Sequence, residues 1–154
     1  MLQKIIGKIW RVSPQIFRAY FVRFTQDTFT VSVGAIVTND EGKVLLLDHV
    51  LRPASGWGVP GGFINYSEQP DEAVKREIVE EIGLEIKNLE LVRIRTIKRH
   101  IEILFRARAS GEGRIKSMEI KQIGWFAPDK MPQEMSEAQK KLIRQVLDGQ
   151  NARN

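Results

Sequence analysis

Residues 57–84 read WGVPGGFINYSEQPDEAVKREIVEEIGL, and their order of chain breakers and helix formers predicts a loop followed by a helix. Glycine and proline fill six of the eleven positions of residues 52–62, which indicates the loop. Pro70 suits the first turn of a helix, and the acidic residues that follow it lie near the positive end of the helix dipole. Gly83 is typical of a residue that ends a helix, so we expect a helix over residues 70–82.

Three glutamates crowd one side of this expected helix. At about 100° per residue, Glu77, Glu80 and Glu81 fall within one sector, beside a sector of aliphatic residues. Like charges three and four residues apart repel, so the arrangement is unfavourable unless a cation lies among them. Carboxylate ligands suit Mg²⁺ or Mn²⁺, which also bind water and phosphate oxygens. A solvated acidic face with Lys75 and Arg76 as partners explains this helix, taken alone, equally well.

The glutamates also belong to a longer pattern of fixed spacing. It reads Gly62-x5-Glu68-x7-Arg76-Glu77-Ile78-x-Glu80-Glu81-x-Gly83-Leu84. So many defined positions at defined distances are far more specific than a lone glycine motif. The chain resembles the Nudix hydrolases, because every defining position of that family's box is filled. The resemblance extends over about residues 28–147.

The resemblance implies an α/β/α sandwich and a pyrophosphohydrolase that cleaves a nucleoside diphosphate linked to another group, with Mg²⁺ or Mn²⁺ as cofactor. It further implies metal ligands, an ion pair that orients one of them, and glycines that shape the backbone around them. These are the ligands Glu77, Glu80, Glu81 and the carbonyl of Gly61, the pair Arg76 and Glu68, and the glycines Gly62 and Gly83. Physical chemistry agrees, since a permanently charged arginine can hold one carboxylate in a fixed direction.

Hydrolysis of a diphosphate requires that its charge be neutralised and that a water molecule be activated, and a divalent cation can do both. The base that accepts the water proton is then either a box glutamate or a carboxylate from a loop. Glu119 is our candidate for the second case, with a plain surface glutamate as the alternative. Arg52, just before the glycine-rich loop, is placed to bind a substrate phosphate.

Other polar residues receive weaker assignments. Arg93 and Arg95 share one strand face, as do Arg106 and Arg108, and we favour a solvated sheet face over phosphate binding for both pairs. The two histidines, at positions 49 and 100, lie outside any nucleophile pattern, and we assign neither a catalytic role.

The rest of the chain predicts strands interleaved with helices. Alternating residues indicate a strand over residues 28–37, which should form a hairpin with a central, wholly apolar strand at residues 44–47. Further strands are expected at residues 91–96, 101–109 and 120–126, before a last helix that Ser136 caps. This order favours an α/β sandwich with a mixed sheet.

The beginning of the chain differs in charge from the remainder. The net charge is +5, and residues 1–24 hold five basic and no acidic residues. We expect two short amphipathic helices here, separated where Ser13 caps the second and Pro14 enters its first turn. Residues 1–26 are therefore assigned as a basic helical extension, residues 27–149 as the Nudix hydrolase domain and residues 150–154 as a tail. Packing of the extension on the domain or in a homodimer is favoured over attachment to a membrane surface.

Composition narrows the remaining possibilities. The chain has 154 residues, no cysteine and no apolar stretch long enough to span a membrane, so we expect one cytoplasmic domain without disulfides or cysteine-bound metals. Nucleoside triphosphates, NDP-sugars and NDP-alcohols all stay open as substrates, and nucleic acid is not the expected partner. The alternative is a non-catalytic Nudix-fold module that binds a nucleotide or RNA, which would not need three metal carboxylates.

Overall fold

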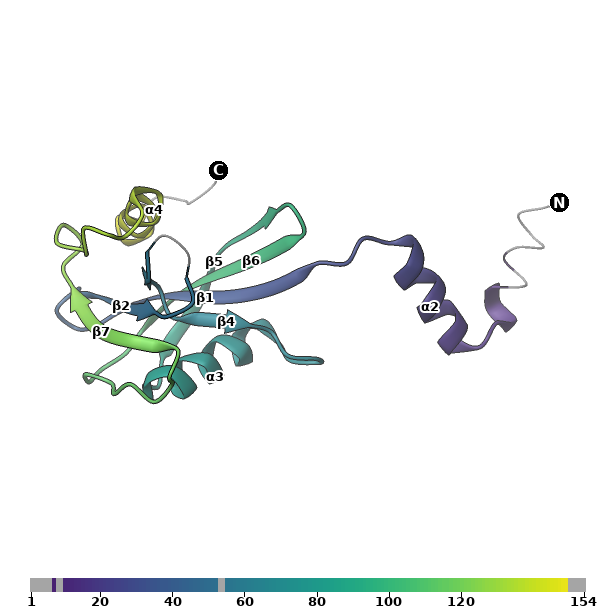
Figure 1. The fold of residues 1–154 in the computed structure, drawn as a ribbon, viewed down its shortest axis with the longest axis horizontal. Helices are drawn as coiled ribbons and strands as arrows, with labels where there is room; N and C mark the ends of the chain where they lie inside the picture. Colours follow the sequence, from purple (N-terminus) through teal and green to yellow (C-terminus); the bar gives the residue numbers. More distant parts are fainter. Residues whose placement is uncertain (1–6, 8–9, 53–54, 150–154) are drawn as a thin grey trace. The chain divides into compact units, whose positions relative to one another are not determined.

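The computed structural model describes residue 7 and residues 10–52 and 55–149. The chain divides into two compact units, Met1–Thr30 and Val31–Asn154, which are described separately. Figure 1 shows the elements in chain order. The strands are β1 (Thr30–Thr38), β2 (Val44–His49), β3 (Trp57–Gly58), β4 (Gly61–Phe63), β5 (Lys87–Ile97), β6 (His100–Arg108) and β7 (Ile120–Phe126), and the helices are α2 (Gln15–Thr25), α3 (Pro70–Ile82) and α4 (Glu137–Leu147).

The strands form one mixed sheet. Its order is β3-β2-β1-β6-β5, with β4 paired to β1 and β7 paired to β2. The expected hairpin is present, since β1 and β2 are antiparallel with Thr38 opposite Val44. β1 and β6 run in the same direction, because Ser32 contacts His100 at their beginnings and Thr38 contacts Ala107 near their ends.

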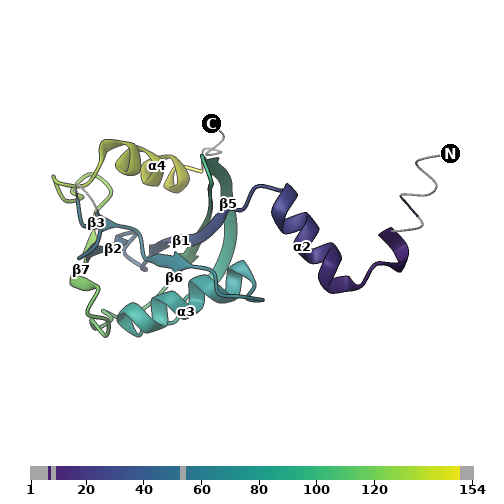
Figure 2. The ribbon, with the colours of Figure 1, turned by 45° about the vertical axis from the view of Figure 1, so that its right-hand side comes forward.

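Two hydrophobic cores lie on opposite faces of the sheet, one under α3 and one under α4 (Figures 1 and 2). β2 contributes to both. Its residues 44–47 are fully buried, and alternate ones pack with α3 or with α4. The α/β/α sandwich and the central place of this apolar strand are therefore confirmed.

Local signals placed both helices of the larger unit correctly. α3 begins at Pro70 and is followed by Gly83 in the left-handed conformation, with φ 68°. The side chain of Ser136 accepts a hydrogen bond from the backbone N–H of Gln139 at 3.2 Å, which caps α4 as expected.

The glycine-rich segment was expected to be a loop, and this prediction is wrong in part. It contains β3 and the first residues of β4, and β4 pairs with β1 through Gly34 opposite Gly61. Backbone pairing of this kind needs no alternation of side chains, so a segment without hydrophobic periodicity gives no strand signal.

The N-terminal unit contains α2 and a short helical stretch at residues 10–12. The expected N-cap of this helix, Ser13, is wrong by one residue. Pro14 is the N-cap of α2, and its carbonyl accepts hydrogen bonds from the backbone N–H groups of Phe17 and Arg18. The rings of Trp10 and Phe21 meet edge to face, with centroids 5.5 Å apart. Most of the expected first helix and the tail at residues 150–154 lie outside the described residues. Within the described part, no helix is long and apolar enough to cross a membrane.

Candidate active site

α3 presents its three glutamates at graded depth beside the core. Val74, Ile78 and Ile82 are fully buried against the sheet and fix the rotation of the helix. The side chain of Glu80 is 59% exposed, whereas that of Glu81 is only 8% exposed. Glu80 therefore faces solvent, whereas Glu81 is buried beside β4.

Arg76 is the centre of the polar contacts around α3. Its guanidinium donates to both carboxylate oxygens of Glu68, at 2.7 and 2.9 Å. It also donates to Glu77 at 2.8 Å and to Glu80 at 3.1 Å. These hydrogen bonds lower the pKa of Glu68 to about 2 and raise that of Arg76 above its usual range. One arginine thus holds three carboxylates, because its planar fork offers several fixed donors.

Glycines let the backbone approach the carboxylates. A Cβ at position 62 would overlap the carboxylate of Glu77, so any residue other than glycine would displace that carboxylate from its observed position. Gly61 has φ +145°, and a Cβ there would overlap the carbonyl of Val33. The N–H of Gly61 donates to Glu81 at 3.2 Å, which links β4 to the helix.

Glu81 is a buried carboxyl among other charges. Burial, together with the negative charges of Glu77 and Glu119, raises its pKa to about 8. The hydrogen bond from Gly61 and the charge of Arg52 act in the opposite direction. Burial is the main cause of the shift, and a bound cation would stabilise the ionised form of such a buried carboxyl.

Arg52 and Glu119 reach this cluster from the loops at the end of β2. Arg52 donates to the carbonyl of Val59 at 3.0 Å, and its guanidinium fills the space where a Cβ of residue 58 would lie. The carbonyl of Glu119 accepts a hydrogen bond from Val50, because β2 and β7 are paired up to this point. Arg52 and Glu119, both expected at the site from the sequence, thus lie close enough to Glu81 for their charges to shift its pKa.

The carboxylates are not gathered around a common point. Among the described residues, no three His, Asp or Glu side chains form a ready group of metal ligands. Arg76 draws Glu77 and Glu80 toward itself, while Glu81 accepts from Gly61. The donor set nevertheless fits a hard divalent cation, because it consists of carboxylate oxygens, and burial and the neighbouring acids together raise the pKa of Glu81.

Comparison with known proteins identifies the family. A family model described as the NUDIX domain matches residues 28–146. The chain belongs to the NUDIX family. A MutT-like protein of Streptomyces ambofaciens is 30% identical to this Nudix chain over 123 residues, or 78% of each protein. A MutT NUDIX hydrolase from Burkholderia pseudomallei has a solved structure that matches with a TM-score of 0.67 and 31% identity, covering 78% of this chain and 99% of that one.

These similarities confirm that the chain is a Nudix hydrolase, an enzyme acting on phosphorus-containing anhydrides, and they support pyrophosphohydrolase activity in general terms. An RNA pyrophosphohydrolase of Ectopseudomonas mendocina is 42% identical over 66 residues. That match covers 43% of this Nudix hydrolase and 40% of the relative.

The strand arginines of this Nudix hydrolase do not share one environment. Arg95 donates twice to Glu102, at 2.6 and 3.2 Å, and Arg106 donates twice to Glu90, at 2.6 and 3.0 Å. Arg93 differs, since its side chain is only 14% exposed. A solvated face therefore describes Arg95 and Arg106 but is wrong for Arg93.

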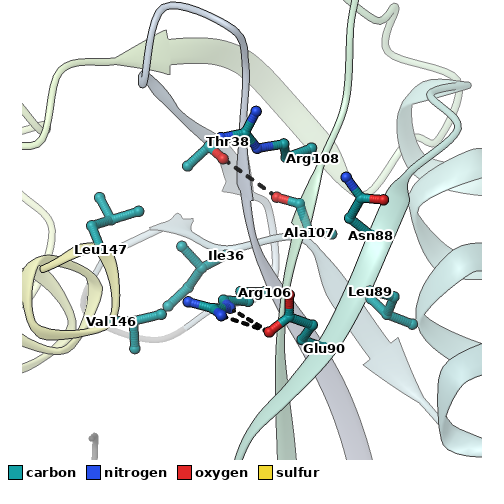
Figure 3. Close-up of a pocket in the computed structure, with 10 residues that line it drawn as sticks. All are labelled: Ile36, Thr38, Asn88, Leu89, Glu90, Arg106, Ala107, Arg108, Val146 and Leu147. Carbon is teal, nitrogen blue, oxygen red and sulfur yellow. Dashed lines mark hydrogen bonds and ion pairs between the residues drawn. The ribbon is translucent and has the colours of Figure 1, made fainter. Parts of the chain in front are cut away.

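A hollow of ≈ 520 Å³ lies on the α4 side of the sheet (Figure 3). Its wall contains the paired Arg106 and Glu90, and its apolar residues include Ile36, Val146 and Leu147. No box glutamate lines it. This hollow is separate from the candidate active site of the Nudix hydrolase.

His49 was left without a role by the sequence, and the structure places it at the site. The residue is buried, and its Nδ1 lies 3.6 Å from a carboxylate oxygen of Glu81. Burial, together with the charge of Arg52, lowers the imidazole pKa to about 4, so the ring is neutral near pH 7. The available signal was slight: Asp48 and His49 are the first polar residues after an apolar strand.

Proposed function

We propose that this Nudix hydrolase is a divalent-metal-dependent pyrophosphohydrolase that cleaves the diphosphate linkage of a nucleoside diphosphate derivative. The observation that supports this most is the buried carboxyl of Glu81, whose pKa is raised by burial and by the neighbouring charges of Glu77 and Glu119. A protein retains such a costly cluster where a bound cation compensates it. The proposed hydrolase domain is residues 27–149.

Glu77, Glu80 and Glu81 would hold Mg²⁺ or Mn²⁺, together with the backbone carbonyl of Gly61. When bound, the cation would neutralise phosphate charge and make a water molecule more acidic. Arg76, itself fixed by Glu68, would keep Glu77 and Glu80 oriented, and the hydrogen bond from Gly61 would do the same for Glu81.

The remaining roles fall to groups around the cluster. Arg52 would bind a substrate phosphate, because its guanidinium lies beside Glu81 and is held at the carbonyl of Val59. Glu119 would accept the proton of the attacking water, since it is an exposed carboxylate whose charge reaches Glu81. Gly62 and Gly83 would be supporting residues, the first because it leaves room for the carboxylate of Glu77.

Three classes of small substrate fit this proposal: nucleoside triphosphates, NDP-sugars and NDP-alcohols. The 5′ end of an RNA is a second candidate, because relatives that match part of this chain are named RNA pyrophosphohydrolases. A cytoplasmic location and a homodimer remain expectations from the sequence.

A substrate panel tests the proposal directly. The full-length protein would be incubated with each nucleotide class and with a 5′-triphosphorylated oligonucleotide, in Mg²⁺, Mn²⁺ or EDTA, and the products separated by chromatography. We expect metal-dependent cleavage within the diphosphate of at least one compound. Glu81→Gln should lose this cleavage, whereas the control Glu85→Gln, at an exposed position beyond α3, should keep it. Cleavage in EDTA, or full activity of Glu81→Gln, would refute the metal-ligand assignment.

A further inference from the structure

Three arginines lie around one glutamate on the α4 side of the sheet. Glu102 on β6 accepts two hydrogen bonds from Arg95 on β5, and it lies 3.6 Å from Nη2 of Arg93. Glu102 is also close enough to Arg52 for its negative charge to raise the pKa of that guanidinium. A single carboxylate cannot balance three guanidinium ions, so this group carries excess positive charge.

Arg93 is the least satisfied member of this group. Its side chain is 14% exposed, compared with 44% for Arg95. Its Nε and Nη2 atoms are buried and have no hydrogen-bond partner within the described part of the chain. The ion pair with Glu102 at 3.6 Å supplies no hydrogen bond, and a buried ionised donor without one destabilises the folded state unless a further acceptor is supplied.

Arg52 connects this group to the acidic cluster of α3. Its guanidinium experiences the charges of both Glu81 and Glu102, although these two glutamates belong to different elements. Burial lowers its pKa, as expected for a cation removed from water. The carbonyl of Val59 holds Arg52, and the side chain of Val59 lies beside Gly34 together with that of Leu104, the residue opposite Arg93. Arg52 therefore lies near both the proposed metal-binding glutamates and the group around Glu102.

We propose that Arg52 and Arg93, with Glu102 between them, form a subsite for a phosphate group of the substrate outside the diphosphate that is cleaved at the α3 glutamates. The inference rests on the proposed function. A phosphate oxygen is a strong acceptor for a guanidinium, and a small rotation of the Arg93 side chain turns its unpaired donors toward the ligand. Glu102 offsets part of the repulsion between the guanidinium groups while the subsite is empty.

This subsite selects among the open substrate classes. A nucleoside triphosphate has a third phosphate for it, whereas an NDP-sugar presents a neutral hydroxylated group at the corresponding end. The inference therefore commits to a 5′-triphosphate. The same chemistry occurs on a free nucleotide and at the end of an RNA, which the substrates in the second experiment distinguish.

The first experiment measures anion binding without catalysis. Inorganic tripolyphosphate would be titrated calorimetrically into the full-length protein in EDTA at low ionic strength. Arg93→Gln should weaken binding by about 10-fold or more, since charge-assisted hydrogen bonds are lost. The matched control is Arg106→Gln, which removes an exposed arginine of β6 that is paired with Glu90, and it should bind as the wild type does.

Glu102→Gln provides a test in the opposite direction. Neutralising this carboxylate increases the excess positive charge, so tripolyphosphate should bind several-fold more tightly. Weaker binding by Glu102→Gln, or equal binding by Arg93→Gln and wild type, would overturn the proposal. Circular dichroism of each variant verifies that the comparison is made between folded proteins.

The second experiment separates this inference from the proposed function. With Mg²⁺, Arg93→Gln should raise KM about 10-fold for a nucleoside triphosphate or a triphosphorylated oligonucleotide, whichever is cleaved, and leave KM for an NDP-sugar unchanged. An equal rise for both kinds of substrate would refute a third-phosphate subsite. If the proposed hydrolysis itself is wrong, the wild type cleaves none of them, while the differences in tripolyphosphate binding persist.

Discussion

Replacing Glu81 by glutamine should stabilise the metal-free protein and at the same time reduce its activity. The folded-state pKa of Glu81 is about 8, above its ordinary value of 4.5, because the carboxyl is buried beside other acids. The folded protein therefore holds this proton more tightly than the unfolded chain does. Stability from this group is fully present below pH 4.5 and is lost as the pH rises toward 8.

The size of the effect follows from the two pKa values. A carboxyl with its pKa raised from 4.5 to about 8 costs the folded state about 3 kcal/mol at pH 7, and less than about 1 kcal/mol at pH 5. A glutamine has no such cost and can still accept the hydrogen bond from Gly61. Allowing for residual denatured-state structure, we expect Glu81→Gln to be more stable than wild type by about 1–3 kcal/mol at pH 7 in EDTA.

Urea denaturation at pH 5, 6, 7 and 8 in EDTA measures this difference directly. Wild type should lose stability relative to Glu81→Gln across the series, and Mg²⁺ should recover the loss for wild type only. Glu80→Gln is the matched control, because that side chain is 59% exposed and its charge costs little. A difference between wild type and Glu81→Gln that does not change with pH would refute the reasoning.

Three further predictions concern the site and the N-terminal unit. Gly62→Ala places a methyl group against the carboxylate of Glu77 and should lower kcat about 10-fold or more with a small change in melting temperature; kcat within two-fold of wild type would contradict the packing argument. Ca²⁺, with its longer and looser coordination, should support far less turnover than Mg²⁺, and the Mg²⁺ rate should rise from acidic to alkaline pH; equal rates with both ions would indicate that the cation only positions the substrate. Deleting residues 1–26 should cause aggregation, lower stability or a changed oligomeric state in light scattering, because the deletion exposes the apolar surface expected to pack with α2. Salt-sensitive binding of the intact protein to anionic vesicles, with an unchanged deletion variant, would favour a membrane role instead.

Elements with strong local signals were predictable from the sequence. The helix over residues 70–82 has a proline, first-turn acids and a following glycine, and each of these acts within one turn of the chain. β7 was placed at its observed limits, because it is a short run with isoleucine and aromatic residues that a proline follows soon afterward. β3 and β4 were missed because they are defined by backbone pairing with β2 and β1, respectively, rather than by their own residue pattern.

The sequence by itself determined the α/β class, the family and the three glutamates on one face of α3, because fixed spacing along a helix is a property of the chain alone. Only the tertiary structure decided how these residues differ. It buries Glu81 beside His49 while leaving Glu80 exposed. It also buries Arg93 without a hydrogen bond at Nε and Nη2, whereas Arg95, two residues away, donates twice to Glu102. Burial and charge balance depend on neighbours contributed by other strands and loops, which no local pattern contains.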